Sequence, residues 1–163
     1  MANELSAMAA SLGALLKERK ETVAVSESST GGLISAALLA VPGASAYFRG
    51  GAVIYTGPAR QGLIGITDEM MKGMRASTEP YALLMARRIR ELMSTTWGLA
   101  ETGATGPTGN RYCDAAGHAC FAVVGGSVEV AVTLETGHGD RGRNMAAFAR
   151  GALELLEAGL RQP

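Results

Sequence analysis

The sequence has few aromatic residues, no excess of either charge and no long apolar run, and these absences exclude several classes of protein. Lys plus Arg and Asp plus Glu number 15 each, and aromatic residues make up 5% of the chain. Nucleic-acid-binding proteins usually carry a basic excess. No apolar stretch approaches the roughly 18 residues of a membrane span, and no secretory signal pattern is found. We therefore expect a cytoplasmic protein without nucleic-acid or membrane partners.

Cysteine is also scarce. Cys113 and Cys120 lie seven positions apart, with His118 between them. Zinc sites in proteins use closely spaced ligand pairs and usually four ligands in all. We expect both residues to be ordinary thiols, and we predict neither a metal nor a cofactor.

The residues that are abundant indicate one globular domain. The chain has 163 residues, of which 47% are apolar, which is enough to bury a core without disulfides or metals. Its 22 glycines cluster in loops, which is typical of tight turns or of backbone held close to a ligand. We expect a single domain over residues 1–163.

Helical and strand patterns alternate along the first part of the chain. Thr30 and Thr78 are predicted to cap the helices that follow them, and the last two strands should form a hairpin across 125–127. This order predicts an α/β fold whose mainly parallel sheet has one antiparallel strand and helices on both faces. The predicted helices cover 3–20, 31–40, 58–64, 79–95 (burying Ala82, Met85, Ala86, Ile89, Leu92 and Met93) and 141–160, and the strands 22–26, 46–56, 97–101, 118–124 and 128–134.

The segment Ser26–Gly32 is the first candidate for chemistry. It joins a buried strand to a helix, and ligands of open α/β sheets bind at the carboxyl ends of strands. Free N–H groups at a helix start can hold an anion or a developing oxyanion, and a serine there is a candidate nucleophile. The alternative is that Ser28, Ser29 and Thr30 only cap the helix.

Two glycine-rich segments are further candidates. Gly103–Gly109 follows the third strand in the sheet pattern and could form an anion-binding nest or a plain flexible loop. Gly137–Arg141 precedes the last helix, where a cation opposes the helix dipole. Arg141 therefore indicates either an anionic ligand or a salt bridge with Asp140. His138 is interpreted as a solvated loop residue.

Tyr55 and Arg60 form a fourth candidate pair after the second strand. The alternative is that Tyr55 is a sheet-edge aromatic residue and Arg60 a solvated helix residue.

Taken in order, these segments resemble the CinA C-terminal domain family, several of whose members are nicotinamide-nucleotide amidases. The resemblance covers nearly the whole chain and rests on five motifs in the same order. It implies the stand-alone form of the family, without the N-terminal domain of longer members. The matching segments are Glu27–Gly32, Val41–Gly51, Tyr55, Thr102–Pro107 and Gly139–Arg141.

The resemblance implies a three-layer α/β/α sandwich with a mixed, mainly parallel sheet. It also implies hydrolysis of the carboxamide of nicotinamide mononucleotide to nicotinate mononucleotide and ammonia. Ser28 would be the nucleophile, with N–H groups near Thr30 and Gly31 stabilising the oxyanion. Relatives commonly self-associate, and Ala-rich helix faces could support this. Contacts to the small-molecule nucleotide are assigned to Thr30, Gly31, Gly32, Thr102, Gly103, Thr105, Gly106 and Arg141, the last at the phosphate.

Two positions depart from the family pattern. Ser29 stands where the family usually has Cys, and Arg60 stands where it has the Lys thought to activate the serine together with the Tyr. Because a guanidinium stays protonated near neutrality, Arg60 cannot accept a proton. It could instead hold Tyr55 as a phenolate base by its charge, or bind an anionic ligand.

Two functions therefore remain open for this sequence. The first is an amidohydrolase with Ser28, Tyr55 and Arg60 in its catalytic centre. The second is a catalytically weak domain that binds a nucleotide or phosphate. A purely structural role would leave the polar, glycine-rich loops at three strand ends unexplained.

Overall fold

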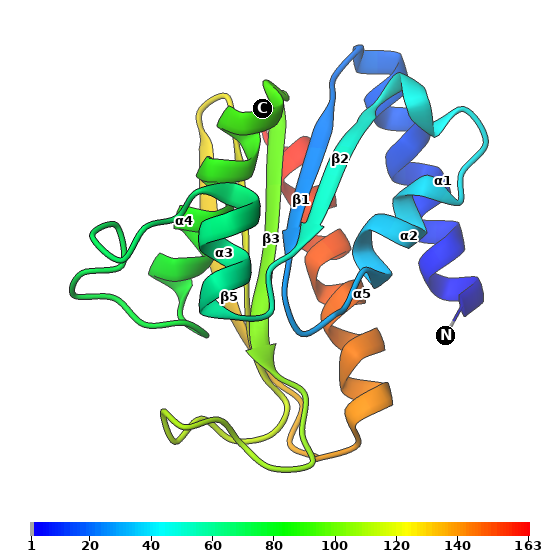
Figure 1. Ribbon diagram of the computed structural model, residues 1–163. Helices are drawn as coiled ribbons and strands as arrows, with labels where there is room; N and C mark the ends of the chain where they lie inside the picture. Colours follow the sequence, from blue (N-terminus) through cyan, green and yellow to red (C-terminus); the bar gives the residue numbers. More distant parts are fainter. Residues whose placement is uncertain (1) are drawn as a thin grey trace.

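A five-stranded sheet with the strand order β2-β1-β3-β4-β5 forms the centre of the molecule in the computed structural model (Figure 1). The structure describes residues 2–163, with side chains from residue 4 onward. β1 pairs in parallel with β2 and β3, whereas β4 is antiparallel to both β3 and β5. The predicted mixed sheet with one antiparallel strand is confirmed. The strands are β1 (Val23–Glu27), β2 (Phe48–Val53), β3 (Trp97–Ala104), β4 (His118–Gly125) and β5 (Val128–Glu135).

Helices cover both faces of the sheet and complete three layers. α1 (Ala2–Arg19), α2 (Leu33–Leu39) and α5 (Arg141–Leu160) pack on one face. α3 (Gly57–Ile64) and α4 (Glu79–Met93) pack on the other. The α/β/α sandwich is thus confirmed. Within the described part of the chain, no helix combines the length and apolar character needed to cross a membrane.

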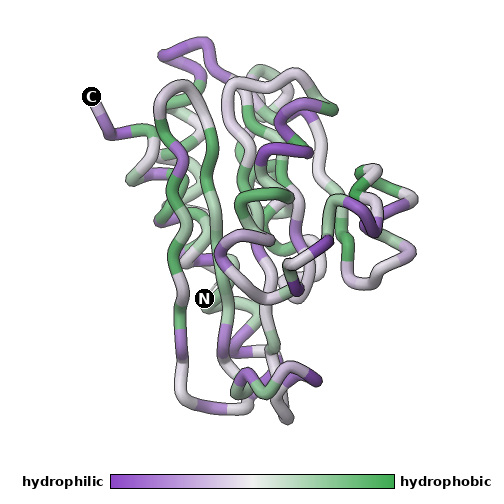
Figure 2. The backbone as a smooth tube through the Cα atoms, turned by 90° about the vertical axis from the view of Figure 1, so that its left-hand side faces the viewer, coloured by the Kyte–Doolittle hydropathy of each residue, from purple (hydrophilic) through white to green (hydrophobic). Residues whose placement is uncertain are grey.

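Each face of the sheet has its own apolar core, because successive side chains of a strand point to opposite faces. In β1, Val23 and Val25 belong to the core under α1, α2 and α5, whereas Ala24 belongs to the core under α3 and α4. β1 is buried along its whole length, as expected for a central parallel strand. Figure 2 shows hydrophobic stretches along the strands and many of the hydrophilic ones in the loops.

Several local signals are confirmed. Thr78 caps α4 by accepting a hydrogen bond from the N–H of Tyr81, with Pro80 in the first turn. α5 begins and ends where the apolar spacing placed it, and β4 and β5 form the predicted hairpin. Such features depend on neighbouring residues, which is why they can be predicted from the sequence.

Other boundaries differ from the prediction. The strand expected over 46–56 is shorter, because residues 44–46 form a 3-10 helix before β2. β3 runs on to Ala104, so Thr102 and Gly103 lie in a strand and not in a loop. The prediction that Leu92 and Met93 are buried was wrong. They are 44% and 39% exposed, since the last turn of α4 extends past the core beneath it.

Candidate active site

The candidate site lies at the edge of the sheet where β1, β2 and β3 end. Because these strands are parallel, the segments that follow them meet at one edge, where ligands of α/β sheets bind. The loop before α5 reaches the same edge. Arg141 of α5 donates hydrogen bonds from Nη1 to the carbonyl oxygen of Gly106 at 2.5 Å and from Nη2 to the hydroxyl of Tyr55 at 3.3 Å. These contacts join the segments that follow β2 and β3.

Ser28 begins the turn that follows β1 and is partly buried. The hydroxyl of Ser29 donates to Glu101, and the hydroxyl of Thr30 contacts Glu27 and Glu101. In contrast, Oγ of Ser28 makes no hydrogen bond to any residue that the structure describes. Of the three hydroxyls in this turn, that of Ser28 is the one available to a ligand.

The interpretation of this turn as a set of helix caps was wrong. α2 starts at Leu33, its N-cap is Gly32, and no side chain of the N-cap bonds to it. The helix start is capped by the buried carboxylate of Glu27, which accepts hydrogen bonds from the N–H groups of Gly32 at 2.7 Å, Ile34 at 3.2 Å and Ser35 at 3.0 Å. A carboxylate favours this position because it satisfies free N–H groups and complements the helix dipole.

The backbone donors expected to stabilise an oxyanion are also engaged elsewhere. The N–H of Thr30 donates to Glu101 at 3.1 Å, and that of Gly31 donates to the carbonyl of Ser28 at 3.1 Å. The N–H of Ser29 has no acceptor among the described residues. It directly follows the nucleophile candidate, and a donor in that position is common in serine hydrolases.

Glu101, on β3, is a fully buried residue that sequence reasoning missed. Its carboxyl group accepts from the N–H groups of Ser28 at 2.9 Å and Thr30 at 3.1 Å, and from the hydroxyl of Ser29. Burial raises the pKa of Glu101, and these hydrogen bonds oppose the rise. The signal in the sequence was an acidic residue at the end of the apolar strand pattern over 97–101. Ser29, the departure from the family's Cys, is a direct partner of this carboxyl group.

The structure does not bring Tyr55 and Arg60 into contact. The guanidinium of Arg60 lies 5.8 Å from the ring centroid of Tyr81. Burial raises the pKa of Tyr81, and the Arg60 charge opposes this. Tyr55 is 60% exposed, and its described partner is Arg141. Arg141 thus stands beside Tyr55 where Arg60 was expected.

Arg141 does not form the salt bridge with Asp140 that we considered. Asp140 is the N-cap of α5 and accepts from the N–H of Arg143 at 3.0 Å. His138, two residues before Asp140 in the loop that leads to α5, was interpreted as solvated, but its side chain is half-buried, and its Nδ1 accepts from the Asp140 N–H at 3.3 Å.

Two of the predicted substrate contacts, Thr102 and Gly103, lie within β3 and have structural roles. Thr102 is buried, and its Oγ1 accepts from the N–H of Ser77 at 3.2 Å. A Cβ atom on Gly103 would lie 2.5 Å from the carbonyl oxygen of His118, so this position requires glycine for the strands to pair. Thr105 and Gly106 follow the strand, and a Cβ on Gly106 would lie 2.7 Å from the carbonyl oxygen of Gly139. The loops after β3 and before α5 therefore touch.

Asn144 holds these two loops together and was also missed. It is fully buried on α5. Its Nδ2 donates to the carbonyl oxygens of Thr105 at 2.9 Å and His138 at 2.8 Å, and its Oδ1 accepts from the Thr136 hydroxyl at 2.6 Å. Nothing in its local sequence distinguishes it from other polar residues of a helix.

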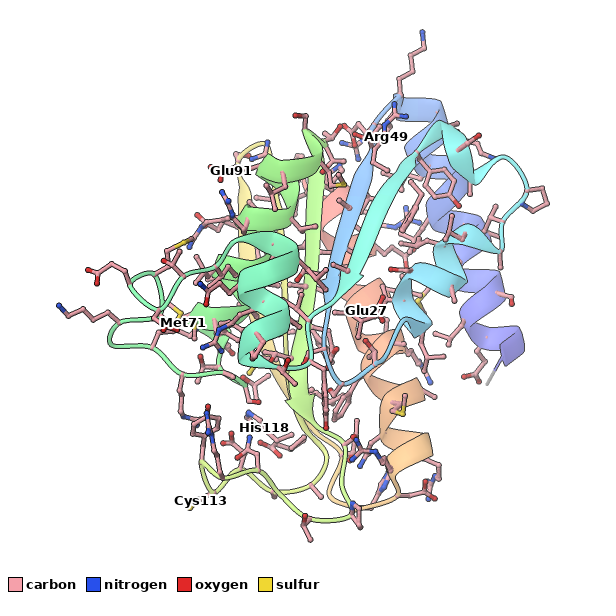
Figure 3. The ribbon with its side chains drawn as sticks, viewed as in Figure 1. Glu27, Arg49, Met71, Glu91, Cys113 and His118 are labelled. Atoms are coloured by element: carbon pink, nitrogen blue, oxygen red, sulfur yellow. The ribbon has the colours of Figure 1, made fainter. Side chains whose placement is uncertain are left out.

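A second polar cluster anchors the remainder of the loop over residues 105–117 (Figure 3). Arg75 binds both carboxylate oxygens of Asp114, at 2.7 and 3.1 Å, and this interaction lowers the pKa of Asp114. Nε2 of His118 bonds to the carbonyl of Ser77 at 2.8 Å. The cysteines are free thiols, Cys113 exposed and Cys120 buried.

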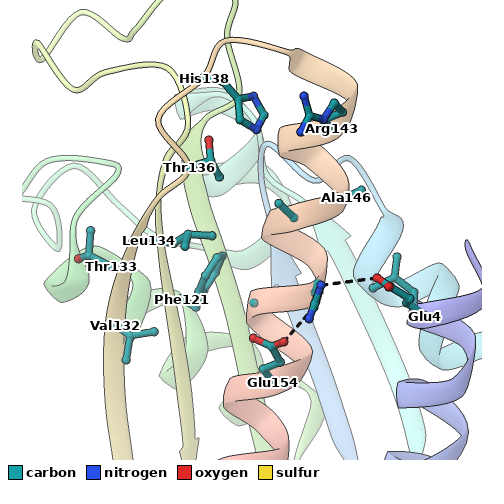
Figure 4. Close-up of a pocket in the computed structure, with 14 residues that line it drawn as sticks. Glu4, Phe121, Val132, Thr133, Leu134, Thr136, His138, Arg143, Ala146 and Glu154 are labelled. Carbon is teal, nitrogen blue, oxygen red and sulfur yellow. Dashed lines mark hydrogen bonds and ion pairs between the residues drawn. The ribbon is translucent and has the colours of Figure 1, made fainter. Parts of the chain in front are cut away.

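A cavity of about 570 Å³ lies between β5 and α5 (Figure 4). His138 and Arg143 lie at its loop end, and Arg150, which pairs with Glu4 at 3.5 Å and Glu154 at 2.9 Å, lines it together with both partners. None of the predicted site residues lines it. The converging polar groups at the ends of β1 and β3 are therefore the better candidate for chemistry.

Comparisons with known proteins agree with this fold. A family model described as the CinA C-terminal domain matches residues 5–160. The chain belongs to the CinA C-terminal domain family. It is 37% identical over 151 residues to a CinA-like protein of Gloeobacter violaceus and 38% identical over 146 residues to one of Syntrophus aciditrophicus. These matches cover 91% and 90% of this chain but 35% of each relative, so the chain spans about a third of their length.

Solved structures of the family have the same fold. The competence/damage inducible protein CihA of Agrobacterium tumefaciens superimposes with a TM-score of 0.89 at 28% identity, covering 97% of this chain and 96% of that one. The competence damage-inducible protein A of Klebsiella pneumoniae gives a TM-score of 0.87 at 26% identity, covering 98% and 96%. The similarity thus extends over the whole domain.

Proposed function

We propose that this CinA-family domain is an amidohydrolase that converts nicotinamide mononucleotide and water to nicotinate mononucleotide and ammonia. The observation that carries the proposal is the unbonded hydroxyl of Ser28 at the carboxyl end of β1, followed by an unbonded backbone N–H at Ser29. A nucleophile beside an oxyanion donor is the arrangement that acyl transfer requires. Family membership and the motif match support the same reaction. Ammonia release by the purified protein tests it.

In the proposed mechanism, Ser28 Oγ attacks the carboxamide carbon while Tyr55, acting as a phenolate, accepts the hydroxyl proton. The oxygen of the resulting tetrahedral intermediate accepts a hydrogen bond from the N–H of Ser29. The C–N bond then breaks, the proton passes to the leaving nitrogen, and ammonia departs from a nicotinoyl ester of Ser28. Water hydrolyses this ester by the reverse proton transfers, so that the enzyme is regenerated. Arg141 supports Tyr55 through its hydrogen bond to the phenolic oxygen.

We assign the substrate phosphate to Arg141 and the neighbouring loop backbone. Two of the guanidinium N–H groups bond to Gly106 and Tyr55, and the others remain for a phosphate. Gly31 and Gly32 after β1 and Thr105 and Gly106 after β3 would border the nucleotide.

Arg141→Ala should lower kcat/KM for nicotinamide mononucleotide by roughly 10- to 100-fold, because hydrogen bonds to charged groups contribute about 1.5–3 kcal/mol. Arg141→Lys should recover only part of the loss, since it keeps the charge without the planar fork. Steady-state kinetics measures both. Arg143→Ala, on the same helix turn, is the matched control, and an equal loss in that variant would contradict the assignment.

A second candidate function, a nucleotide-binding domain with little turnover, is favoured by one observation. Arg60 cannot accept a proton, and it lies against Tyr81 rather than Tyr55. In that case nicotinamide mononucleotide at a hundred times its Kd would stabilise the fold by about 2.7 kcal/mol without releasing ammonia. Arg60→Lys would then create or strongly increase ammonia release. A thermal shift and an ammonia assay on both proteins separate the two functions, because turnover in the parent protein equal to that of Arg60→Lys excludes the second.

A cytoplasmic location and self-association through the Ala-rich helix faces are part of the same proposal. Both follow from the family resemblance and from a substrate class found inside cells. Gel filtration with light scattering tests the oligomeric state.

A further inference from the structure

Two buried glutamates meet beneath the Ser28 turn. Glu27 ends β1, and Glu101 lies on the neighbouring strand β3, one position after the paired residues Ser26 and Ala100. Both glutamates are fully buried. Both also contact the same hydroxyl: Oγ1 of Thr30 lies 2.7 Å from Oε1 of Glu27 and 2.8 Å from Oε2 of Glu101. The two carboxyl groups are thus separated by a single hydroxyl oxygen.

Counting protons shows that this arrangement is unfavourable when both carboxyl groups are ionised. Each of the two short oxygen–oxygen contacts at Thr30 needs a proton between its atoms to be attractive. The threonine hydroxyl has one proton and can donate it to one acceptor. One of the two contacts therefore lacks a proton of its own while both carboxyl groups are ionised. Two carboxylates held at a shared site favour the same result, because like charges in a buried environment repel strongly.

The donors around each carboxyl group indicate which one holds the proton. Apart from the Thr30 hydroxyl, Glu27 accepts four hydrogen bonds, from the N–H groups of Gly32, Ile34 and Ser35 and from the Ser35 hydroxyl. Glu101 accepts three. Glu27 also lies at the start of α2, where the dipole favours a negative charge. The charge therefore belongs on Glu27 and the proton on Glu101, whose pKa burial raises.

No nearby cation changes this balance. Within the described residues, neither carboxyl group takes part in an ion pair. Glu27 is the titratable group that faces Glu101 from β1, Ser35 is the polar neighbour on α2, and the residue opposite Glu101 on β4 is Phe121. Among the described residues, hydrogen bonds rather than ion pairs therefore stabilise the negative charge of Glu27 and Glu101.

We propose that Glu27 and Glu101 share one negative charge at neutral pH, with the proton on Glu101, and that Glu101 in this form is a positioning residue for Ser28. Glu101 acts through the turn, because its Oε2 holds the N–H groups of Ser28 and Thr30 on either side of Ser29. This leaves the Ser29 N–H unbonded beside the nucleophile. A second negative charge would push Glu101 away from Glu27 and shift the turn. The positioning role rests on the proposed amidase function, whereas the shared charge does not.

The charge state can be measured in the intact protein by carbon-13 NMR of the glutamate carboxyl carbons, assigned with Glu27→Gln and Glu101→Gln. At pH 7 the Glu101 carbon should resonate at the position of a protonated carboxyl and the Glu27 carbon at that of a carboxylate. Two ionised carboxylates, or a proton on Glu27, would overturn the proposal. Neither carbon-13 measurement requires turnover, so this test of the shared charge is independent of the amidase assay.

The two isosteric variants should differ in stability. Glu101→Gln replaces a neutral group with a neutral one and should lower the Tm by less than about 3 °C, whereas Glu27→Gln leaves several buried donors facing an NH₂ group and should lower it by roughly 5–10 °C. A raised pKa in the folded state stabilises the protein below the unfolded value of about 4.3, and this contribution is lost as the pH rises towards the folded pKa. The Glu101→Gln variant has no carboxyl group to ionise at this position and does not lose this stabilisation. Its Tm relative to that of the parent protein should therefore rise with pH. Equal losses in the two variants would contradict the assignment.

The positioning role has its own readout. The amide resonances of Ser28 and Thr30 should titrate together with the Glu101 carboxyl, and this titration should be absent in Glu101→Gln. In the active enzyme, kcat should fall over the same pH range while KM stays nearly constant. Amide resonances that do not follow the carboxyl titration would refute the positioning role and leave the shared charge to be judged from the carbon spectra.

Discussion

Replacing Ser28 with alanine is expected to abolish ammonia release from nicotinamide mononucleotide, with a fall in kcat on the order of 10⁴-fold or more, as for other serine nucleophiles. The fold should be unaffected. The Ser28 hydroxyl bonds to no described residue, so its removal leaves no buried partner unsatisfied, and the free energy of unfolding should change by less than about 0.5 kcal/mol. An enzyme-coupled ammonia assay and urea unfolding measure the two effects.

Ser127→Ala is the matched control for this experiment. Ser127 is an exposed serine in the β4–β5 hairpin, at the end of the sheet away from the candidate site. The control should keep full activity. Unchanged ammonia release by the folded Ser28→Ala variant would show that another group is the nucleophile and would remove the basis of the proposed mechanism.

Replacing Asn144 with alanine is expected to cost about 3 kcal/mol of stability and to lower the amidase activity as well. The amide side chain is fully buried and satisfies the carbonyl oxygens of Thr105 and His138 and the hydroxyl of Thr136. Each buried polar group left without a partner costs roughly 1–3 kcal/mol, and water entering the space offsets part of this. Urea unfolding curves of both proteins, fitted with the same dependence of free energy on urea concentration, give the change in the free energy of unfolding.

The activity should fall because Asn144 fixes the two loops that meet at the proposed phosphate site. The loop with Thr105 leads directly to Gly106, which accepts a hydrogen bond from Arg141. A loosened loop should therefore raise KM before it changes kcat. Arg150→Ala, on an exposed face of the same helix, breaks only surface ion pairs and should cost less than about 1 kcal/mol. If Asn144→Ala were as stable as this control, the loops must be held by other contacts.

The shared proton of Glu27 and Glu101 relates the departure at Ser29 to the rest of the site. The Ser29 hydroxyl is a stronger hydrogen-bond donor than the thiol of the usual cysteine, and its acceptor is the buried carboxyl group of Glu101. Ser29 and Glu101 thus form one local unit beneath the nucleophile. This unit fixes the turn through its buried side, while the hydroxyl of Ser28 makes no hydrogen bond to the described residues.

The sequence by itself determined the features that depend on neighbouring residues. The apolar spacing of α5, the Thr78 cap, the glycine-bearing β4–β5 hairpin and the order of helices and strands follow from local periodicity and hydrogen bonding. The motif order also determined family membership, and with it the position of Ser28 at a strand end. These signals required no knowledge of which strands pair.

Tertiary structure alone decided which polar groups meet. Tyr55 bonds to Arg141, 86 positions away, rather than to Arg60 in the next helix. Thr30 has the sequence of a helix cap, but two carboxyl groups from adjacent strands compete for its hydroxyl, one of them 71 positions away. The Thr30 hydroxyl therefore bonds to these buried carboxyl groups, which are strong partners, instead of accepting from a backbone N–H at the helix start. Strand order and register bring these carboxyl groups next to Thr30, so the local pattern of a helix cap could not reveal them.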